Sequence, residues 1–247
     1  MTRQPHAAGQ TAGGAHFIRT GWQFVERRVI VPALDLLFPP VCVACERVGT
    51  LLCERCVADF TPLTVELSRA APPLSDKVAL GVFSGPLQTA IHALKYDRLT
   101  ALAIPLGDLM AGRIREAAWP VSLLIPIPLH ASRQRERGYN QAALLGAVIA
   151  DRLGWTQEPD LLVRVRQTRT QVGLGYRERQ ENVAGAFAVA TPDRVKGCDV
   201  ILVDDVYTTG ATMRECALVL LQAGARTVRA VVAGQAGAAT WVAVPPS

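Results

Sequence analysis

The chain of 247 residues has room for one ordinary domain and a small additional module, with ample length for a packed core. Half of its residues are apolar, 19% are charged and 6% are aromatic, which is the composition of a soluble globular protein. The net charge of +5 is a modest excess without a dense basic run, so contact with nucleic acid is permitted but not indicated. Neither a secretory signal nor a window of about twenty apolar residues occurs, and we therefore expect a cytoplasmic protein without a membrane span.

The two ends of the chain differ in composition from its middle. Residues 1–16 are polar and rich in Gly and Ala, so we expect a disordered N-terminal extension. Residues 17–38 place apolar side chains at helical spacing, which predicts an amphipathic helix that is interrupted or restarted at Pro32. We expect this helix to pack on the protein's own core, and the alternative is binding to a partner or a membrane surface. Residues 235–247 are expected to form a flexible tail.

A cysteine cluster lies within residues 39–62, where we place a small zinc ribbon. Cys42 and Cys45 form one Cys-x-x-Cys pair, Cys53 and Cys56 form another, and seven residues separate the two pairs. In a reducing cytoplasm, two such pairs on a short, turn-rich stretch predict a tetrahedral four-cysteine zinc site rather than disulfides. Four thiolates leave no coordination position for water or substrate, so we expect the zinc to be structural.

An α/β domain is expected over residues 77–234, where the apolar residues alternate between strand and helix spacing. The predicted elements before the last third of this domain are strands at 78–83, 121–125 and 161–165, helices at 87–94 and 101–117, and a helix that opens at 138–141 and ends at Gly154. Residues 166–182 are polar, rich in arginine and without apolar alternation, which indicates a mobile lid or a surface helix. Residues 186–190 are expected to return to the main sheet.

Basic residues follow two of these elements. Lys95 comes after the first predicted helix, where it is either a solvated residue near the helix C-terminus or a contact for phosphate or substrate. Arg133, Arg135 and Arg137 fall within five residues after the second predicted strand. Three guanidiniums so close together suit a cluster of phosphate oxygens, and the alternative is a solvated basic turn.

The stretch 200–212, VILVDDVYTTGAT, carries the strongest indication of a binding site. Its four apolar residues predict a short strand that is buried on both faces, as in a parallel sheet. Asp204 and Asp205 come where that strand ends, at the edge where open α/β sheets bind ligands. The turn that follows offers successive backbone N–H groups, hydroxyls and a glycine, which suits a phosphate; its residues are Thr208, Thr209, Gly210, Ala211 and Thr212. The alternative is an ordinary strand, turn and helix with two surface acids.

A helix and a last strand are predicted after this turn. Thr212 and Glu215 have the spacing of a capping box, which predicts the start of the helix, and Gly224 marks its end. The last strand is expected at 227–233.

The same stretch resembles the phosphoribosyl diphosphate (PRPP) binding motif of type I phosphoribosyltransferases: four apolar residues, two acids, two less constrained residues and then TTGAT. The resemblance implies that Asp204 and Asp205 hold the ribose hydroxyls and that residues 208–212 bind the 5′-phosphate. It also implies that the loop after the strand at 121–125 binds diphosphate, which would engage the three arginines.

Several motifs taken together resemble the ComF competence-protein family, in order and spacing over residues 34–234. They are the four-cysteine ribbon, the IPIPL strand exit, RERGYNQA, QVGLGYRERQENVAGAF and VILVDDVYTTGAT. The resemblance implies an α/β fold: a type I phosphoribosyltransferase-like domain with a mostly parallel sheet, preceded by a small four-cysteine zinc ribbon. It also implies a link to natural transformation and DNA uptake beside a helicase-like partner. The polar N-terminal extension is additional to this pattern.

Three hypotheses of function follow. The first is an enzyme that transfers phosphoribose from PRPP, with Mg²⁺, to an unidentified amine or base and releases diphosphate, with Asp204 and Asp205 as its catalytic residues. No residue stands out as the base that activates the nucleophile. The second is a non-catalytic adapter or nucleotide sensor that docks a helicase-like partner through the zinc ribbon. A third, weaker hypothesis is binding of single-stranded nucleic acid by the arginine segments, which offer few aromatic side chains for base stacking.

Overall fold

The computed structural model describes residues 39–120, 122–166 and 176–237, and the chain divides into two units at residues 1–40 and 41–247. Three predicted segments therefore lie outside the described residues: the extension, the amphipathic helix and most of the tail. Residues 167–175 of the predicted lid also lie outside them. Within the described ranges, no helix is both long enough and apolar enough to cross a membrane.

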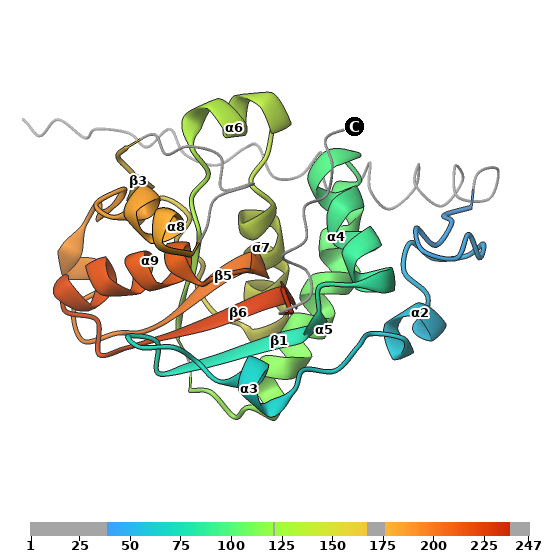
Figure 1. Ribbon diagram of the computed structural model, residues 1–247, viewed down its shortest axis with the longest axis horizontal. Helices are drawn as coiled ribbons and strands as arrows, with labels where there is room; N and C mark the ends of the chain where they lie inside the picture. Colours follow the sequence, from blue (N-terminus) through green and yellow to red (C-terminus); the bar gives the residue numbers. More distant parts are fainter. Residues whose placement is uncertain (1–38, 121, 167–175, 238–247) are drawn as a thin grey trace, which may run out of the picture. The chain divides into compact units, whose positions relative to one another are not determined.

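The described elements alternate between helices and strands for most of the second unit (Figure 1). In chain order they are α2 (Glu54–Ala58), α3 (Val65–Ser68), β1 (Asp76–Val82), α4 (Gly85–Tyr96), η1 (Thr100–Leu102), α5 (Ala103–Glu116), β2 (Leu123–Pro126), α6 (Ala131–Arg137), α7 (Gln141–Leu153), β3 (Leu162–Arg164), α8 (Tyr176–Val183), β4 (Phe187–Val189), η2 (Pro192–Arg194), β5 (Asp199–Tyr207), α9 (Ala211–Gln222) and β6 (Thr227–Gln235).

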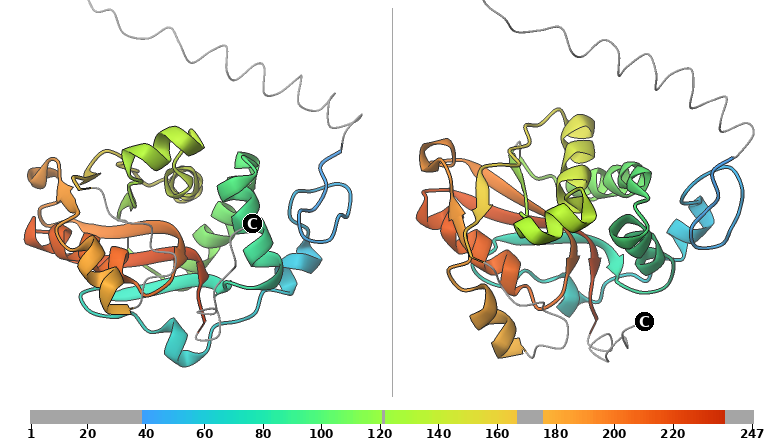
Figure 2. Two further views of the ribbon diagram at one scale, coloured as in Figure 1. Left: turned by 45° about the horizontal axis from the view of Figure 1, so that its top comes forward. Right: turned by 90° about the horizontal axis from the view of Figure 1, so that it is seen from above.

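Four strands form one parallel sheet in the order β1-β6-β5-β2, which confirms the predicted mostly parallel α/β fold. Side chains from β5 alternate between two hydrophobic clusters, as the period of two in a strand requires. Ile201 and Val203 pack with α4, α5 and α7, whereas Val200 and Leu202 pack with α9. Figures 1 and 2 show these two groups of helices on opposite faces of the sheet. The predicted burial of this strand on both faces is therefore confirmed.

The second, smaller sheet corrects one prediction from the sequence. β3 and β4 pair with each other in antiparallel fashion, so residues 186–190 do not return to the main sheet. The edge of the main sheet beyond β2 is already in use, because Leu124 exchanges backbone hydrogen bonds with Thr156 and Glu158. A further strand therefore finds no free ladder at that edge.

The four-cysteine module shares its hydrophobic core with the α/β domain. Cys42, Cys53 and Cys56 are buried in the same cluster as Leu87 and Ile91 of α4. The module is short, with one antiparallel bridge between Val41 and Val48 followed by α2. A stretch of this size buries too little apolar surface to be stable alone, so contact with α4 supplies part of its core.

An ion pair fixes the start of β5 at the end of the sheet remote from the acid pair. The carboxylate of Asp199 accepts hydrogen bonds from the Thr227 hydroxyl at 2.6 Å and from the Arg226 Nε at 3.1 Å. These hydrogen bonds, from Arg226 first and Thr227 second, lower the pKa of Asp199 to about 2. The carboxylate therefore joins β5 to the start of β6 as a charged group.

We predict that Asp199→Asn lowers the free energy of unfolding by about 1 kcal/mol at neutral pH. The expected loss is small because Arg226 is exposed, and solvent weakens its attraction to Asp199. A carboxyl group with a depressed pKa stabilises the fold above its unfolded pKa near 3.8, and this contribution is lost as the pH falls toward 2. Urea unfolding should therefore show the difference between the two proteins shrinking below pH 4. Asp160→Asn, at an exposed turn, is the matched control and should change little.

Candidate functional site

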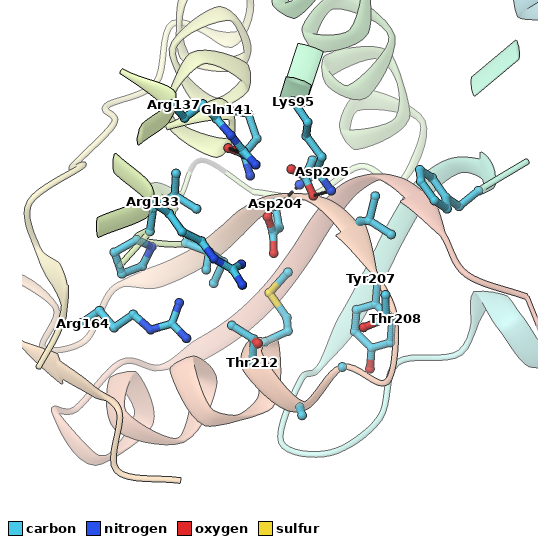
Figure 3. A pocket seen from close by; sticks show the side chains of 18 of the residues that line it. Lys95, Arg133, Arg137, Gln141, Arg164, Asp204, Asp205, Tyr207, Thr208 and Thr212 are labelled. Atoms are coloured by element: carbon cyan, nitrogen blue, oxygen red, sulfur yellow. Dashed lines mark hydrogen bonds and ion pairs between the residues drawn. The ribbon is translucent and has the colours of Figure 1, made fainter. Parts of the chain in front are cut away.

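A cavity of about 350 Å³ opens where β5 ends and α9 begins (Figure 3). It receives side chains from both layers of helices and from both sheets. Its lining residues are Phe83, His92, Lys95, Tyr96, Ile127, Pro128, Leu129, Arg133, Arg137, Gln141, Arg164, Asp204, Asp205, Val206, Tyr207, Thr208, Gly210, Ala211, Thr212 and Met213. A cavity at the carboxyl edge of a parallel sheet is where ligands bind in open α/β folds.

The acid pair forms the floor of this cavity. Lys95 reaches from α4 and places its Nζ 2.7 Å from Oδ1 of Asp205, whose side chain is 5% exposed. The other oxygen, Oδ2 of Asp205, is buried and has no hydrogen-bond partner within the described part of the chain. A buried carboxylate oxygen without a donor is costly, so this atom is suited to receive one from a ligand.

The pKa of Asp204 is raised in the folded protein. Burial, followed by the negative charge of Asp205, raises the pKa of Asp204 to about 7, although Lys95 and Arg164 act in the opposite direction. One carboxylate oxygen of Asp204 accepts a hydrogen bond from the Asp205 backbone N–H at 2.8 Å. Two adjacent acids are thus held at a sheet edge, and the ion pair to them comes from Lys95. This arrangement favours a ligand that brings hydroxyl donors or positive charge.

The turn after β5 is shaped by Gly210. This residue has φ +72° and is the N-cap of α9, and a Cβ atom there would overlap the phenol of Tyr207. The Ala211 N–H donates to the Thr209 hydroxyl at 3.3 Å. The predicted capping box is wrong, because Thr212 lies inside the helix and Glu215 instead accepts a hydrogen bond from the Gly185 N–H at 2.6 Å. Gly210, the N-cap, has no side chain of its own, and the first turn of α9 lines the cavity, where the start of a helix suits an anion.

A buried lysine supports this turn from behind. Lys77 on β1 is 4% exposed, donates to the side-chain oxygen of Gln235, and places its Nζ 4.3 Å from the ring centroid of Tyr207. Burial lowers the pKa of Lys77 to about 8, so the ammonium is mostly charged at neutral pH. The cation fixes Tyr207, and Tyr207 in turn fixes Gly210.

The arginine cluster lies on a helix, α6, rather than on a basic turn. His130 caps this helix by accepting a hydrogen bond from the Ser132 N–H at 3.2 Å. Arg133 and Arg137 line the cavity, whereas Arg135, between them on the helix, is not among its lining residues. The helical turn explains the split, because positions four apart share a face and the position between them does not.

Arg164 was not identified from the sequence. It lies on β3, lines the cavity and extends toward Arg133 (Figure 3). Burial, and then the charge of Arg133, lower the pKa of Arg164. Its guanidinium carbon lies 5.2 Å from the ring centroid of Phe187 on β4. The one signal in the sequence was an arginine inside an apolar strand.

The structure brings most of the predicted ligand-binding residues together. Lys95, both acids and the turn residues Thr208, Gly210, Ala211 and Thr212 line the one cavity, and Thr209 is buried beside it. Phe83, His92, Tyr96 and Gln141 are lining residues that the sequence analysis did not single out. Three of them belong to the turn before α4 or to α4 itself, an element predicted only as a packing helix.

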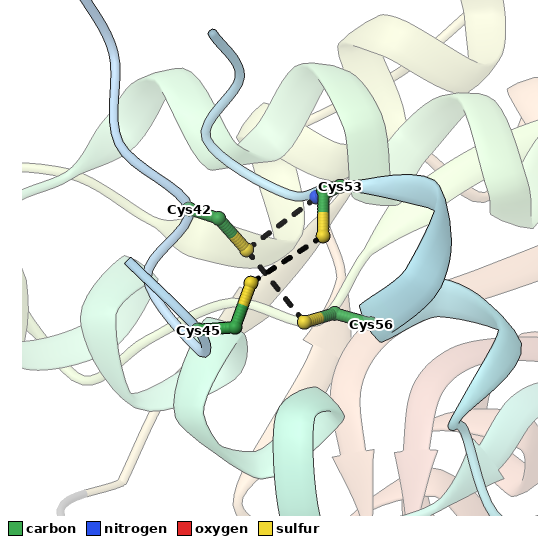
Figure 4. A group of neighbouring side chains, drawn as sticks. All are labelled: Cys42, Cys45, Cys53 and Cys56. Carbon is green, nitrogen blue, oxygen red and sulfur yellow. Dashed lines mark hydrogen bonds between the residues drawn. The ribbon is translucent and has the colours of Figure 1, made fainter. Parts of the chain in front are cut away.

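The second site is the cysteine cluster (Figure 4). The Sγ atoms of Cys42, Cys45, Cys53 and Cys56 all lie within 4.8 Å of one another, so the four side chains could hold a metal ion. The Cys53 backbone N–H also approaches the Cys42 sulfur at 3.5 Å. Backbone donors of this kind stabilise thiolates, which are the form that binds metal.

Comparison with known proteins identifies the family. No protein-family model matches the chain. DNA utilization protein YhgH of Salmonella typhimurium is 33% identical over 197 residues, which cover 76% of this chain and 86% of that protein. Competence protein F of Haemophilus influenzae is 33% identical over 165 residues, or 64% of this chain and 72% of that protein.

The chain belongs to the ComF family of competence proteins. The family predicted from the motifs is thereby confirmed. Among solved structures, glutamine PRPP amidotransferase of Bacillus subtilis, complexed with ADP and GMP, resembles this ComF-family chain over 58% of its length. The TM-score is 0.41, the sequence identity is 18%, and the match covers 30% of the amidotransferase.

The charge state of Asp204 generates a prediction about stability. Its pKa is raised in the folded chain, so the folded state holds the proton more tightly than the unfolded state, and stability is lost as the pH rises from about 4 to about 7. In buffer without Mg²⁺, we predict that Asp204→Asn is more stable than the parent at pH 8 by on the order of 2 kcal/mol. At pH 5.5 the difference should be smaller. Urea unfolding at the two pH values measures it, with the exposed Asp193→Asn as control; a difference that is equal at both would contradict the assignment.

Proposed function

We propose that this ComF-family protein binds PRPP together with Mg²⁺ and transfers its phosphoribosyl group to an amine or base, releasing diphosphate. The observation that carries the proposal is the convergence of three kinds of group in one cavity: two acids, the start of a helix and several cations. PRPP presents the complementary groups, namely ribose hydroxyls, a 5′-phosphate and a diphosphate. The reaction belongs to the cytoplasm, where reduced thiols also persist.

The acids suit the ribose. A hydroxyl of the sugar can donate to Oδ2 of Asp205, which otherwise has no donor within the described ranges, while Oδ1 remains paired with Lys95. Asp204, beside it, can accept from the neighbouring hydroxyl. Each such bond to a charged acceptor contributes about 1.5–3 kcal/mol of binding.

The turn suits the 5′-phosphate. Residues 208–212 offer backbone N–H groups at the start of α9, a helix of 12 residues whose dipole favours an anion there. The left-handed conformation of Gly210 produces the concave backbone, and Lys77 adds a positive charge behind Tyr207.

The guanidiniums suit the leaving diphosphate. Arg133 and Arg137 approach the cavity from α6, and Arg164 approaches from β3. Asp204 and Asp205 would also suit Mg²⁺ and its water shell, because carboxylates are its usual protein ligands and Oδ2 of Asp205 can accept from a bound water as well as from the ribose. When bound, Mg²⁺ neutralises charge on the departing diphosphate. The arginines then fix the direction in which the leaving group departs.

The proposal is tested by calorimetric titration with PRPP in the presence and absence of Mg²⁺. We predict Mg²⁺-dependent binding that Asp205→Asn weakens by about tenfold or more, since a charge-assisted hydrogen bond is lost. Arg133→Gln should weaken binding of PRPP by about tenfold but affect ribose 5-phosphate, which lacks the diphosphate, much less.

Arg135→Gln is the matched control, because Arg135 lies on the same helix but is not among the cavity-lining residues. Its PRPP affinity should stay within about twofold of the parent. If the folded protein does not bind PRPP with Mg²⁺, the transferase proposal is wrong.

A structural zinc ion in the cysteine cluster is the second part of the proposal. Four thiol sulfurs within 4.8 Å of one another match a tetrahedral Cys₄ site. We predict that Cys45→Ser abolishes stoichiometric zinc and lowers the thermal midpoint by about 5 °C or more, because the ribbon loses a ligand that helps hold it against α4. Zinc content is measured with a chromophoric chelator and the midpoint by scanning calorimetry.

Cys198→Ser serves as the control, since Cys198 lies outside the cluster and is half-buried. It should keep its zinc. Retention of zinc by Cys45→Ser at full occupancy and unchanged stability would count against the site.

Docking of a helicase-like partner in DNA uptake is the second candidate function. The relatives are named for competence and DNA utilization. In the ribbon, the two residues that form the antiparallel bridge, Val41 and Val48, have exposed side chains. Exposed apolar side chains beside a structural metal site suit contact with another protein. This adapter role is compatible with PRPP binding, and it would stand alone if PRPP binding fails.

A further inference from the structure

The face of α4 that carries Lys95 also carries a histidine. His92 precedes Lys95 by three residues, a spacing that places both side chains on one side of a helix, and both line the cavity. Lys95 reaches Asp205 at 2.7 Å. The imidazole therefore lies about one helical turn from the group that holds the acid pair, on the same wall of the cavity.

The ring of His92 is oriented by aromatic packing. Its centroid lies 5.5 Å from that of Phe83 at 58° and 5.6 Å from that of Tyr96 at 77°. The guanidinium carbon of Arg137 in turn lies 5.5 Å from the ring centroid of Tyr96. Tilted and edge-on contacts of this kind fix a ring without using its nitrogens.

No hydrogen bond joins either ring nitrogen of His92 to another described residue. Its nitrogens are therefore available to a ligand in the cavity, which His92 lines. The combination of a fixed ring and open nitrogens in a ligand cavity is that of a proton acceptor.

The surroundings keep this imidazole neutral. Burial first, and then the charge of Lys95, lower the pKa of His92, while Asp97 and Asp205 act in the opposite direction. The charged groups that face it are thus Lys95 of α4, Asp97 directly after α4, Asp205 of β5, and Arg137 of α6, which contacts Tyr96. A neutral imidazole is the form that can take up a proton near pH 7.

We propose that His92 is the base that removes the proton from the acceptor during phosphoribosyl transfer, an inference that rests on the proposed function. The acceptor nitrogen, or a water oxygen in its place, forms the bond to C1 of the ribose. The bond from C1 to the diphosphate oxygen breaks, and its electron pair leaves with the diphosphate. The acceptor's proton passes to the open nitrogen of His92 and from there to solvent.

The neighbours of His92 also indicate the shape of the acceptor. Phe83 and Tyr96 line the cavity on either side of the imidazole, and Tyr96 is 66% exposed. An exposed aromatic side chain at the lip of a cavity suits a planar ring that stacks on it. The acceptor side of the site is therefore suited to a heterocyclic amine whose N–H is directed at His92.

The test uses the zinc-loaded full chain with Mg²⁺ and PRPP, and it measures released diphosphate with water, ammonium ion, adenine, guanine, cytosine and uracil as acceptors. His92→Gln should lower the turnover rate by about 100-fold with the best acceptor, the usual range for loss of a general base. Its PRPP affinity, measured by calorimetry, should remain within about twofold. Thr89→Ala, an exposed change one turn earlier on α4, should alter neither quantity.

Two readouts distinguish a base from a structural residue. The parent's kcat/KM should fall on the acid side of the ordinary histidine pKa of about 6.5, and His92→Gln should lose this limb of the profile. Added imidazole should restore part of the activity of His92→Ala. The protein has four histidines, so the His92 ring signal can be assigned by its absence from the spectrum of the variant and followed directly.

Each failure has a separate meaning. Absence of PRPP binding overturns the proposed function itself. Binding of PRPP without diphosphate release in the presence of any of the acceptors overturns the transfer reaction of the proposed function, and with it the role of His92. A His92→Gln variant as active as the parent overturns the role of His92 alone. An inactive variant that keeps the parent's pH profile and is not rescued by imidazole also overturns it, because the loss would then be structural.

Discussion

The ion pair between Lys95 and Asp205 joins the two halves of the site. It connects the last turn of α4 to the end of β5 over 2.7 Å, and both side chains are largely withdrawn from solvent. An ion pair in this position is costly to break from one side only, because the remaining charge would be buried without its partner. The pair therefore sets the position of α4 relative to the acid pair, and with it the position of every cavity residue that α4 carries.

The central strand makes this arrangement rigid. β5 lies between β6 and β2, and its residues alternate between two hydrophobic clusters, one beneath α4, α5 and α7 and the other beneath α9. Neither face can shift without disturbing a packed interior. Asp204 and Asp205 inherit this rigidity because they continue the strand, and the turn at Gly210 inherits it through Tyr207. Polar groups that must meet a ligand in one geometry are thus attached to a strand that is packed on both faces.

The sequence is most informative where the residues of a predicted site lie close together in the chain. The acids, the turn and the four cysteines are contiguous or nearly so, and their spacing predicts a site without knowledge of the fold. The sequence was insufficient where distant elements meet. Arg164 and His92 reach the cavity from β3 and α4, and neither has a neighbour in the sequence that marks it as a ligand contact.

The errors in local structure have the same origin. Thr212 and Glu215 have the spacing of a capping box, but the close approach of Tyr207 to the turn requires glycine at the N-cap, and Glu215 is engaged by Gly185 from another element. The pairing of β3 with β4 is a contact between segments more than twenty residues apart, and residues 156–158 lie at the β2 edge of the main sheet. In both cases contacts between residues far apart in the chain determine the structure, and the local sequence pattern does not.

The burial of Cys42, Cys53 and Cys56 against α4 bears on how the chain can be divided. In the sequence the ribbon looks like a separate module, but in the structure its buried cysteines belong to the same hydrophobic cluster as residues of α4. A shortened chain that begins after residue 62 would expose part of the apolar face of α4, including the surroundings of Leu87 and Ile91, and such a patch invites aggregation. A chimaera that takes its ribbon from a relative would also need the α4 residues that pack against that ribbon.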